Sequence, residues 1–243
     1  MKDTYFELIE NKRIAKNTFL CVLRGDVTDI SAAGQFVNIK LDGFYLRRPI
    51  SVCDVEGDNL TLIYKAVGAG TEVMSNTYPG EFWLVLTGLG NGYDLTKSGD
   101  KPLLIGGGAG VPPMYYLAKK LIAEGKSPSV ILGFGSEDEV FFKEEFEKLG
   151  VPTYVTTVDG SFGIKGFVTD ALPSIDYTYF YTCGPEPMLK AIYDKTETGG
   201  QFSFEERMGC GFGACMGCTC KTKYGNKRIC RDGPVLEKEE IIW

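Results

Sequence analysis

Short apolar runs separated by glycine and aspartate turns fill the first third of the chain. The runs are rich in Val, Ile, Phe, Tyr and Thr, which favour β-strands over helices. Short strands at such spacing predict an antiparallel β-barrel or a sandwich. The expected strands cover residues 19–23, 36–41, 50–55, 60–67 and 82–86, and one helical stretch covers 71–76.

The pattern changes near residue 100, where apolar runs begin to alternate with helical segments. This alternation predicts a doubly wound, open parallel sheet with helices on its faces. From about residue 200, closely spaced cysteines and glycines indicate a small cofactor-bound module. We therefore expect a multi-domain chain, β then α/β, with domains at 1–98, 99–198 and 199–243. The strands expected in the second domain cover 103–105, 130–134, 153–158 and 178–182, and the helices 112–123, 138–149, 168–172 and 185–194.

Composition limits the classes of function. The 243 residues are 44% hydrophobic and 24% charged, which suits folded domains rather than a disordered chain. A net charge of -6 without a basic stripe argues against nucleic acid as a partner. No segment reaches the roughly 18 apolar residues of a membrane span, and the first residues are charged. We therefore expect a cytoplasmic protein without membrane contact.

The chain has eight cysteines and no histidine, which indicates that bound cofactors carry its chemistry. In a reducing cytosol, cysteines indicate metal or redox chemistry more often than disulfides. The lack of histidine removes Ser-His and Cys-His catalysis, and also His-ligated zinc, haem and Rieske clusters. We therefore expect no catalytic side chain and assign the chemistry to bound cofactors.

The cysteines of the third domain have the spacing of an iron-sulfur site. Cys210, Cys215 and Cys218 form a C-x4-C-x2-C pattern, and Cys230 follows. This spacing matches the plant-type ligand set of a [2Fe-2S] cluster. The neighbouring glycines suit a loop that wraps round a cluster and aims N–H groups at sulfur. Two alternatives stay open: a structural zinc site, which usually has two C-x2-C pairs, and Cys220 in place of Cys218.

A glycine-rich turn predicts a nucleotide site at the start of the second domain. It links the strand 103–105 to the helix 112–123, and N–H groups at such a helix start favour phosphate. A tight turn without a ligand is the alternative. The glycines expected to contact the nucleotide are Gly106, Gly107, Gly108 and Gly110.

The segment that follows the second strand of this domain bears on the choice of nucleotide. Residues 135–139 are acidic and include no arginine pair, so a 2′-phosphate would be repelled there and NADH is favoured over NADPH. The alternative is that these acids only cap the following helix.

Several motifs together resemble those of ferredoxin reductase-type flavoproteins over residues 1–195. The resemblance implies FAD in the first domain and NAD(P)H in the second. It implies that Arg48, Ser51, Lys65, Gly70 and Thr71 hold the flavin and its diphosphate, that Pro49, Ile50, Ile63 and Tyr64 line the site, and that Cys183 and Gly184 lie near the nicotinamide. The motifs are Arg48-Pro-Ile-Ser51, Tyr64-Lys65, Gly68-Ala-Gly70-Thr71, residues 106–112 and Cys183-Gly184-Pro185 with Met188.

The cysteine segment narrows the resemblance to the electron-transfer subunits of NAD-dependent (type B) dihydroorotate dehydrogenases. The position of the segment after the nucleotide domain and the motif Cys230-Arg-Asp-Gly-Pro234 support this likeness. It implies electron transfer between NAD, FAD, the [2Fe-2S] cluster and the FMN of a separate catalytic subunit. That partner oxidises dihydroorotate to orotate in pyrimidine biosynthesis, and the family forms a heterotetramer of two plus two chains. The alternatives are a subunit of an NAD(P)H-ferredoxin or sulfide dehydrogenase complex, and a non-catalytic flavoprotein that acts as redox sensor or scaffold.

Two apolar features near the cysteines are candidates for a docking surface. One is the end of the chain at 241–243, and the other is the cysteine loop beside Met208 and Met216. A cluster must come close to its partner before electrons can cross. Ordinary core packing of these side chains is the alternative.

Overall fold

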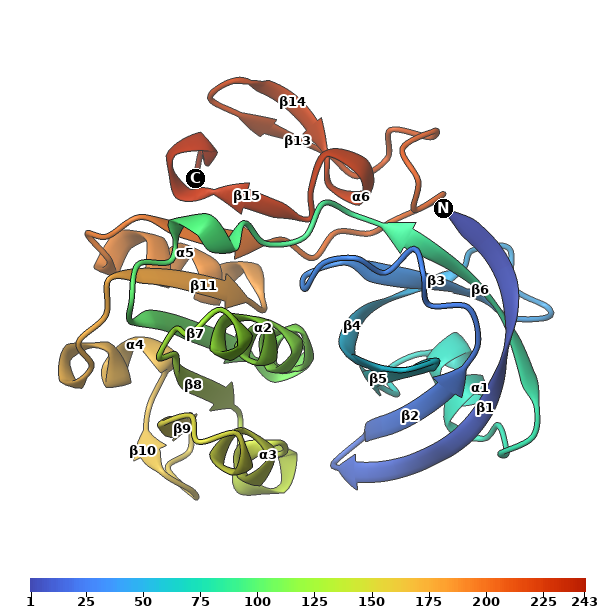
Figure 1. Cartoon of the computed structure of the whole chain (residues 1–243), viewed down its shortest axis with the longest axis horizontal. Coiled ribbons are helices and arrows are strands. Elements are labelled where there is room, and N and C mark those ends of the chain that lie inside the picture. The colour runs from blue at the N-terminus through green and yellow to red at the C-terminus, as the bar shows by residue number, and fades with distance from the viewer.

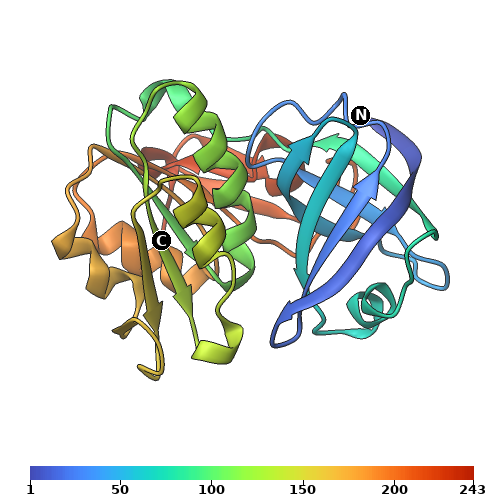
Figure 2. The same cartoon turned by 60° about the horizontal axis from the view of Figure 1, so that its bottom comes forward.

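The computed structural model describes all 243 residues and contains two bodies side by side. A β-barrel formed by the first third of the chain lies beside an α/β sheet, and the C-terminal segment runs along one side of both (Figure 1). The turned view shows the same two bodies with helices packed on the sheet (Figure 2). No helix is both long and apolar enough to span a bilayer.

Six antiparallel strands form a closed barrel. Of the two predicted alternatives, the barrel rather than the sandwich is therefore confirmed. Its interior is filled by fully buried side chains that include Phe6, Leu23, Ile39 and Leu62. The strand order is β1-β2-β5-β4-β3-β6. The elements are β1 (Lys2–Ala15), β2 (Thr18–Arg24), β3 (Phe36–Lys40), β4 (Arg48–Glu56), β5 (Asn59–Lys65), the helix α1 (Ala69–Ser75) and β6 (Phe82–Leu89).

The second body is a seven-stranded sheet in the order β10-β9-β8-β7-β11-β12-β15. All of its pairs are parallel except that of β12 with β15, which confirms the expected parallel sheet. The strands are β7 (Pro102–Gly107), β8 (Ser129–Phe134), β9 (Thr153–Thr157), β10 (Ile164–Lys165), β11 (Tyr179–Cys183), β12 (Gly200–Ser203) and β15 (Val235–Glu237). The helices are α2 (Val111–Ala123), α3 (Lys143–Lys148), α4 (Val168–Ala171) and α5 (Glu186–Lys195), with 3-10 turns η1 (Leu95–Lys97), η2 (Gly108–Gly110), η3 (Glu137–Glu139) and η4 (Leu172–Ser174).

Alternating side chains of the central strand divide the core into two layers. Leu104 of β7 packs with α2, α3 and the barrel, whereas its neighbours Leu103 and Ile105 pack with α4, α5 and the C-terminal segment. This two-sided burial is typical of parallel strands covered on both faces. Most buried barrel side chains belong to the layer of Leu104, whereas Phe36, Leu86 and Leu89 of the barrel belong to the layer of Leu103 and Ile105.

The helix expected at 138–149 begins later than predicted. Residues Glu137–Glu139 form the short turn η3, and α3 starts only at Lys143. Phe142 has a left-handed backbone with a φ of 65°, which breaks a continuous helix at this point. The acidic residues therefore stand apart from α3.

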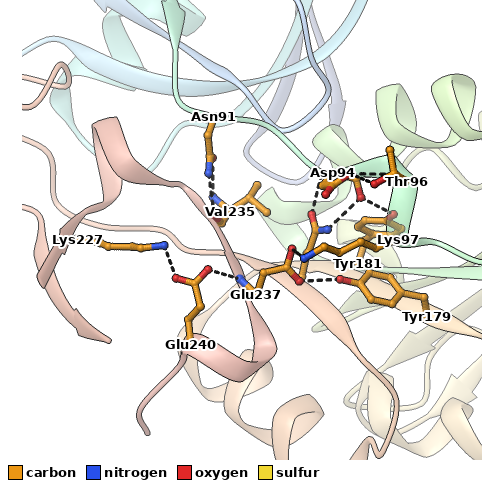
Figure 3. Close-up of polar contacts among 11 residues, drawn as sticks. Asn91, Asp94, Thr96, Lys97, Tyr179, Tyr181, Lys227, Val235, Glu237 and Glu240 are labelled. Atoms are coloured by element: carbon orange, nitrogen blue, oxygen red, sulfur yellow. Dashed lines mark hydrogen bonds and ion pairs between the residues drawn. The ribbon is translucent and has the colours of Figure 1, made fainter. Parts of the chain in front are cut away.

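The C-terminal segment is joined to both bodies. It forms the hairpin β13 (Thr219–Thr222) and β14 (Gly225–Arg228), the helix α6 (Ile229–Asp232), β15 and the turn η5 (Lys238–Glu240). Polar side chains hold β15 in place (Figure 3). The Asn91 amide donates to the Val235 carbonyl over 2.9 Å. The Glu237 carboxylate pairs with Lys97 over 2.8 Å and accepts from the Tyr179 hydroxyl. The domain bounds 1–98, 99–198 and 199–243 stay a prediction. Two strands of the third predicted domain, β12 and β15, complete the sheet of the second.

Candidate functional site

Arg48 lies at the start of β4 against the first turn of α1. A Cβ added to Gly70 would lie 2.1 Å from Nε and 2.4 Å from Cζ of Arg48, so only glycine leaves room for the guanidinium. The guanidinium carbon is 4.6 Å from the centre of the Phe44 ring, and the group donates to the Leu46 carbonyl. Arg48 is thus held beside a helix start, where its charge suits an anionic ligand.

The side chains around Arg48 differ in accessibility. Pro49, Ile50 and Ser51 of β4 are half-buried and pair with β3, whereas the pairing of β4 with β5 begins only at Val52. Ile63 and Tyr64 of β5 are buried in the barrel core. Sequence reasoning therefore grouped half-buried residues of β4 with two residues that the structure places in the barrel core.

Tyr64 and Thr71 hold the local structure of this site. The Tyr64 ring stacks on Phe19 with centroids 5.8 Å apart, and its hydroxyl donates to Asn11 over 3.0 Å. Burial raises the pKa of Tyr64, so the phenol stays neutral. Thr71 Oγ1 accepts hydrogen bonds from the backbone N–H groups of Val67 and Gly68 at 3.0 and 3.2 Å, which fixes the entry to α1.

Lys65 connects the barrel site with the second body. Its Nζ lies 3.0 Å from Oε2 of Glu139, which follows β8. A Cβ placed on Gly108 would be 3.7 Å from the same Nζ. The last residue of β5 therefore borders the glycine-rich turn.

The glycine-rich turn packs directly on the carboxyl end of β11. A Cβ on Gly110 would lie 2.1 Å from the Cys183 carbonyl oxygen and 2.6 Å from the Gly184 nitrogen. A Cβ on Gly107 would lie 2.4 Å from Sδ of Met188. The two motifs identified separately in the sequence thus lie against each other, at the strand ends where open α/β sheets bind ligands.

Cys183 is a buried thiol at the end of β11. Burial raises its pKa, so the group is a protonated thiol near neutral pH. A thiol in this state packs as a small apolar group rather than acting as a nucleophile.

The acidic segment after β8 contacts the barrel instead of capping a helix. Asp138 pairs with Lys16 over 2.9 Å, and Glu139 pairs with Lys65. Glu137 is exposed, and its backbone N–H donates to the Ser161 hydroxyl over 2.8 Å. The helix-capping alternative is wrong, because α3 begins only at Lys143.

The predicted cluster ligands lie together as two pairs. Cys210 Sγ accepts from the backbone N–H of Cys215 over 3.4 Å, and Cys218 Sγ accepts from that of Cys230 over 3.4 Å. Burial raises the pKa of Cys210, but several backbone N–H groups outweigh this effect and bring it down to about 6. No group of three or more His, Cys, Asp or Glu side chains is arranged to hold a single metal ion.

Cys218 directly precedes the hairpin strand β13, whereas Cys220 lies within it. Cys218 is buried, whereas Cys220 lines a cavity of about 200 Å³ together with Phe204 and Trp243. Burial raises the pKa of the Cys220 thiol. Cys220 therefore borders a cavity formed with the C-terminal residues.

Sequence reasoning missed Asn38, which contacts the cysteine loop. Its side-chain amide donates to the Cys210 carbonyl over 3.3 Å, and a Cβ on Gly211 would lie 2.3 Å from its nitrogen. Asn38 belongs to β3 and pairs with Pro49 of β4 in the barrel ladder. The cysteine loop is therefore anchored one strand away from the Arg48 motif.

The apolar features near the cysteines differ from one another. Ile241 is buried, and Trp243 packs against Phe202 and Phe204 with ring centroids 6.4 and 5.8 Å apart. Met216 of the cysteine loop is exposed. Core packing therefore describes Ile241 and Trp243, whereas Ile242 between them and Met216 of the cysteine loop are exposed.

Solved structures with the same fold define the class of protein. The structure of an NADH-dependent reduced ferredoxin-NADP oxidoreductase matches with a TM-score of 0.90 and 29% identity, over 98% of this chain and 90% of that one. A ferredoxin NADP+ reductase from Neisseria gonorrhoeae matches with a TM-score of 0.70 at 16% identity, over 80% of this chain and 90% of that one, which is a likeness of fold. The chain is a ferredoxin reductase-like oxidoreductase.

Matches in sequence identify the family within this class. Residues 104–194 match the oxidoreductase NAD-binding domain, and residues 205–242 match the iron-sulfur cluster binding domain of dihydroorotate dehydrogenase B. A dihydroorotate dehydrogenase B (NAD(+)) electron transfer subunit from Bacillus pumilus is 43% identical over 99% of this chain and 98% of that protein. One from Fusobacterium nucleatum is 47% identical over 96% and 95%. This chain belongs to the family of dihydroorotate dehydrogenase B electron transfer subunits.

Proposed function

We propose that this chain carries electrons between NAD(H) and the FMN of a catalytic subunit that oxidises dihydroorotate to orotate, through its own FAD and [2Fe-2S] cluster. One observation supports this order of cofactors most directly. The strand β4, which begins with Arg48, is flanked by β5 on one side and β3 on the other. Lys65 of β5 borders the glycine-rich turn, and Asn38 of β3 holds the cysteine loop. A flavin on β4 would therefore lie between nucleotide and cluster.

FAD fits the Arg48 site on structural grounds. Arg48 fills a space that any side chain at residue 70 would take, and it stands at the start of α1 as a cation for a diphosphate. The backbone of Pro49, Ile50 and Ser51 does not pair with β5 and would meet a flat ring on that side. When bound, FAD supplies two-electron exchange with nicotinamide and one-electron exchange with a cluster.

A [2Fe-2S] cluster fits the cysteine loop. The pair of Cys210 with Cys215 would hold one iron, and the pair of Cys218 with Cys230 would hold the other. The backbone N–H groups that meet these sulfurs would stabilise a cluster with net negative charge, since dipoles aimed at sulfur favour it. Cys220 is a neighbouring thiol in this assignment, because it lines a cavity with Trp243.

NADH is the expected nucleotide at the glycine-rich turn. The close approach of Gly110 to Cys183 and Gly184 leaves backbone, rather than side chains, next to the ligand. Glu137 is exposed in the segment that follows β8, where a dinucleotide-binding fold meets the adenosine ribose. A carboxylate there suits the ribose hydroxyls of NADH and disfavours the phosphate of NADPH.

The partner would dock over the cysteine loop. Phe212 and Met216 of this loop are exposed apolar side chains beside the proposed cluster, and the shortest electron path to a second protein leaves from there. The family resemblance supports a heterotetramer of two plus two chains in the cytoplasm.

The division of labour between the two chains provides the test. The isolated chain, purified with FAD and its cluster, should reduce artificial acceptors with NADH and should not oxidise dihydroorotate. An added FMN-bearing catalytic subunit should restore dihydroorotate-dependent reduction of NAD, followed at 340 nm. Turnover of dihydroorotate by the single chain would contradict the proposal.

The alternative assignment, an NAD(P)H-ferredoxin oxidoreductase subunit, draws on the likeness to the reduced ferredoxin-NADP oxidoreductase structure. It predicts ferredoxin reduction by NADPH without the catalytic subunit, so the same preparation separates the two functions.

A further inference from the structure

We infer that Lys119 is a positioning residue that locks the flavin-binding strand β4 to the nucleotide-binding helix α2 and so sets the geometry for hydride transfer. The inference rests on the proposed function. It concerns a contact between the two bodies that lies away from both cofactor sites.

Lys119 reaches from α2 to two carboxylates of β4. Its Nζ lies 2.6 Å from Oδ2 of Asp54 and 2.7 Å from Oε1 of Glu56. The side chain of Asp54 is only 10% exposed and that of Lys119 is 25% exposed, whereas that of Glu56 is 73% exposed. The second oxygen of Asp54 is buried without a hydrogen-bond partner, so Lys119 is the cation that balances this carboxylate.

Electrostatics favour a persistent contact. Burial lowers the pKa of Lys119, but its hydrogen bonds to Asp54 and Glu56 outweigh this effect and leave the pKa raised. The ammonium group also lies 5.9 Å from the centre of the Tyr115 ring on the same helix. Lys119 is therefore charged at neutral pH and held from several sides.

Two other ion pairs cross between the bodies, and both differ from this contact. Lys16 with Asp138 has side chains that are about half exposed. Lys65 with Glu139 joins residues that border the nucleotide turn itself. Exposed pairs contribute little because solvent screens them. The pair of Lys119 with Asp54 is thus the least exposed of the three and lies away from the cofactor sites.

The elements that meet at Lys119 are the same ones that carry the two cofactor sites. The helix α2 starts at Val111, directly after the glycine-rich turn, and Lys119 lies about 12 Å further along the axis at 1.5 Å per residue. The strand β4 starts with the Arg48 motif, and Asp54 follows Ser51 by about 10 Å at 3.3 Å per residue. Figure 1 shows α2 between the sheet and the barrel. A rotation at this contact would therefore be transmitted to the distance between flavin and nicotinamide.

The test compares Lys119→Met with Lys120→Met, both in the chain loaded with FAD and its cluster. Lys120 is the next residue of α2, is exposed and makes no ion pair with the barrel, so it controls for loss of one charge from the same helix. We expect Lys119→Met to slow flavin reduction by NADH in stopped flow by roughly 10- to 100-fold, as ångström-scale misplacement does. The Kd for NADH should change less than twofold, and the long-wavelength charge-transfer absorbance of the NADH complex should weaken. Lys119→Arg should restore both signals.

A second variant covers the possibility that a buried, unbalanced Asp54 prevents folding. Lys119→Met combined with Asp54→Leu removes both charges and should fold while keeping the slow reduction. Wild-type reduction rates in either folded variant would overturn the positioning role. A wild-type flavin that NADH does not reduce at all would overturn the proposed function together with this inference, and so separates the two failures.

Discussion

Gly70 and Gly68 offer a matched pair for testing the Arg48 site. Both lie at the start of α1, and both would gain one methyl group on replacement by alanine. A Cβ at Gly70 would fall 2.1 to 2.4 Å from the Arg48 guanidinium, whereas nothing lies within 4 Å of a Cβ at Gly68. Neither glycine has a positive φ, so alanine is compatible with both backbones. Gly70→Ala should therefore displace Arg48, and Gly68→Ala should leave it in place.

The magnitude follows from what Arg48 would contribute to binding. A charge-assisted hydrogen bond is worth about 1.5 to 3 kcal/mol, which is roughly a 10- to 150-fold change in Kd for FAD. The stability of Gly70→Ala should not fall in parallel, because residue 70 lies within α1 and alanine is favoured over glycine in a helix by up to about 1 kcal/mol. The substitution thus lowers the affinity for FAD but favours the helix, so weaker FAD binding would not reflect unfolding.

The assay is titration of the apoprotein with FAD, followed by flavin fluorescence, for wild type, Gly70→Ala, Gly68→Ala, Arg48→Ala and the Gly70→Ala/Arg48→Ala double variant. Gly70→Ala and Arg48→Ala should each weaken binding, and the double variant should be no weaker than Arg48→Ala, since both changes act through one side chain. Equal affinity of Gly70→Ala and Gly68→Ala for FAD would refute the site. Full additivity would show that Gly70 acts independently of Arg48.

Two further predictions concern the cluster and the nucleotide. Cys215→Ser or Cys230→Ser should lose iron and acid-labile sulfide, while Cys220→Ser should retain both, because its thiol lines the cavity with Trp243. Loss of iron in the Cys220 variant would contradict the ligand assignment. Glu137→Arg should raise the NADPH-to-NADH ratio of kcat/KM roughly tenfold, about 1.4 kcal/mol for exchanging a repulsive for an attractive charge. Glu144→Arg, the same charge change on exposed surface of α3, should leave the ratio unchanged, and an unchanged ratio in Glu137→Arg would remove the basis for NADH preference.

The parts of the fold that follow from local patterns could be predicted from the sequence. Strands such as β8 are short apolar runs buried on both faces, and they stand out in any window. The strand β1 was missed because charged residues fill much of it and only Phe6 and Leu8 are fully buried. The strands β12 and β15 have four and three residues, too few to show a period.

The candidate site also has parts that could be predicted from the sequence and parts that could not. The cysteine spacing and the glycine-rich turn are local signals and can be recognised in one chain. The contacts of Asn38 with Cys210 and of Lys119 with Asp54 join residues 172 and 65 positions apart. Such contacts depend on how the barrel packs on the sheet and the cysteine loop, and no pattern in a single sequence records that packing.

With the flavin on β4 as proposed, the position of this strand also limits where a partner protein could receive electrons. The side of β4 toward β5 faces the nucleotide turn through Lys65, so a partner docked there would compete with NADH for the flavin. The side toward β3 leads through Asn38 to the cysteine loop, where Met216 is exposed. A partner at the loop leaves the nucleotide site open, and both ends of the electron path can then be occupied at once. This arrangement favours docking at the cysteine loop over docking at Ile241 and Trp243, whose apolar side chains are already packed against the sheet.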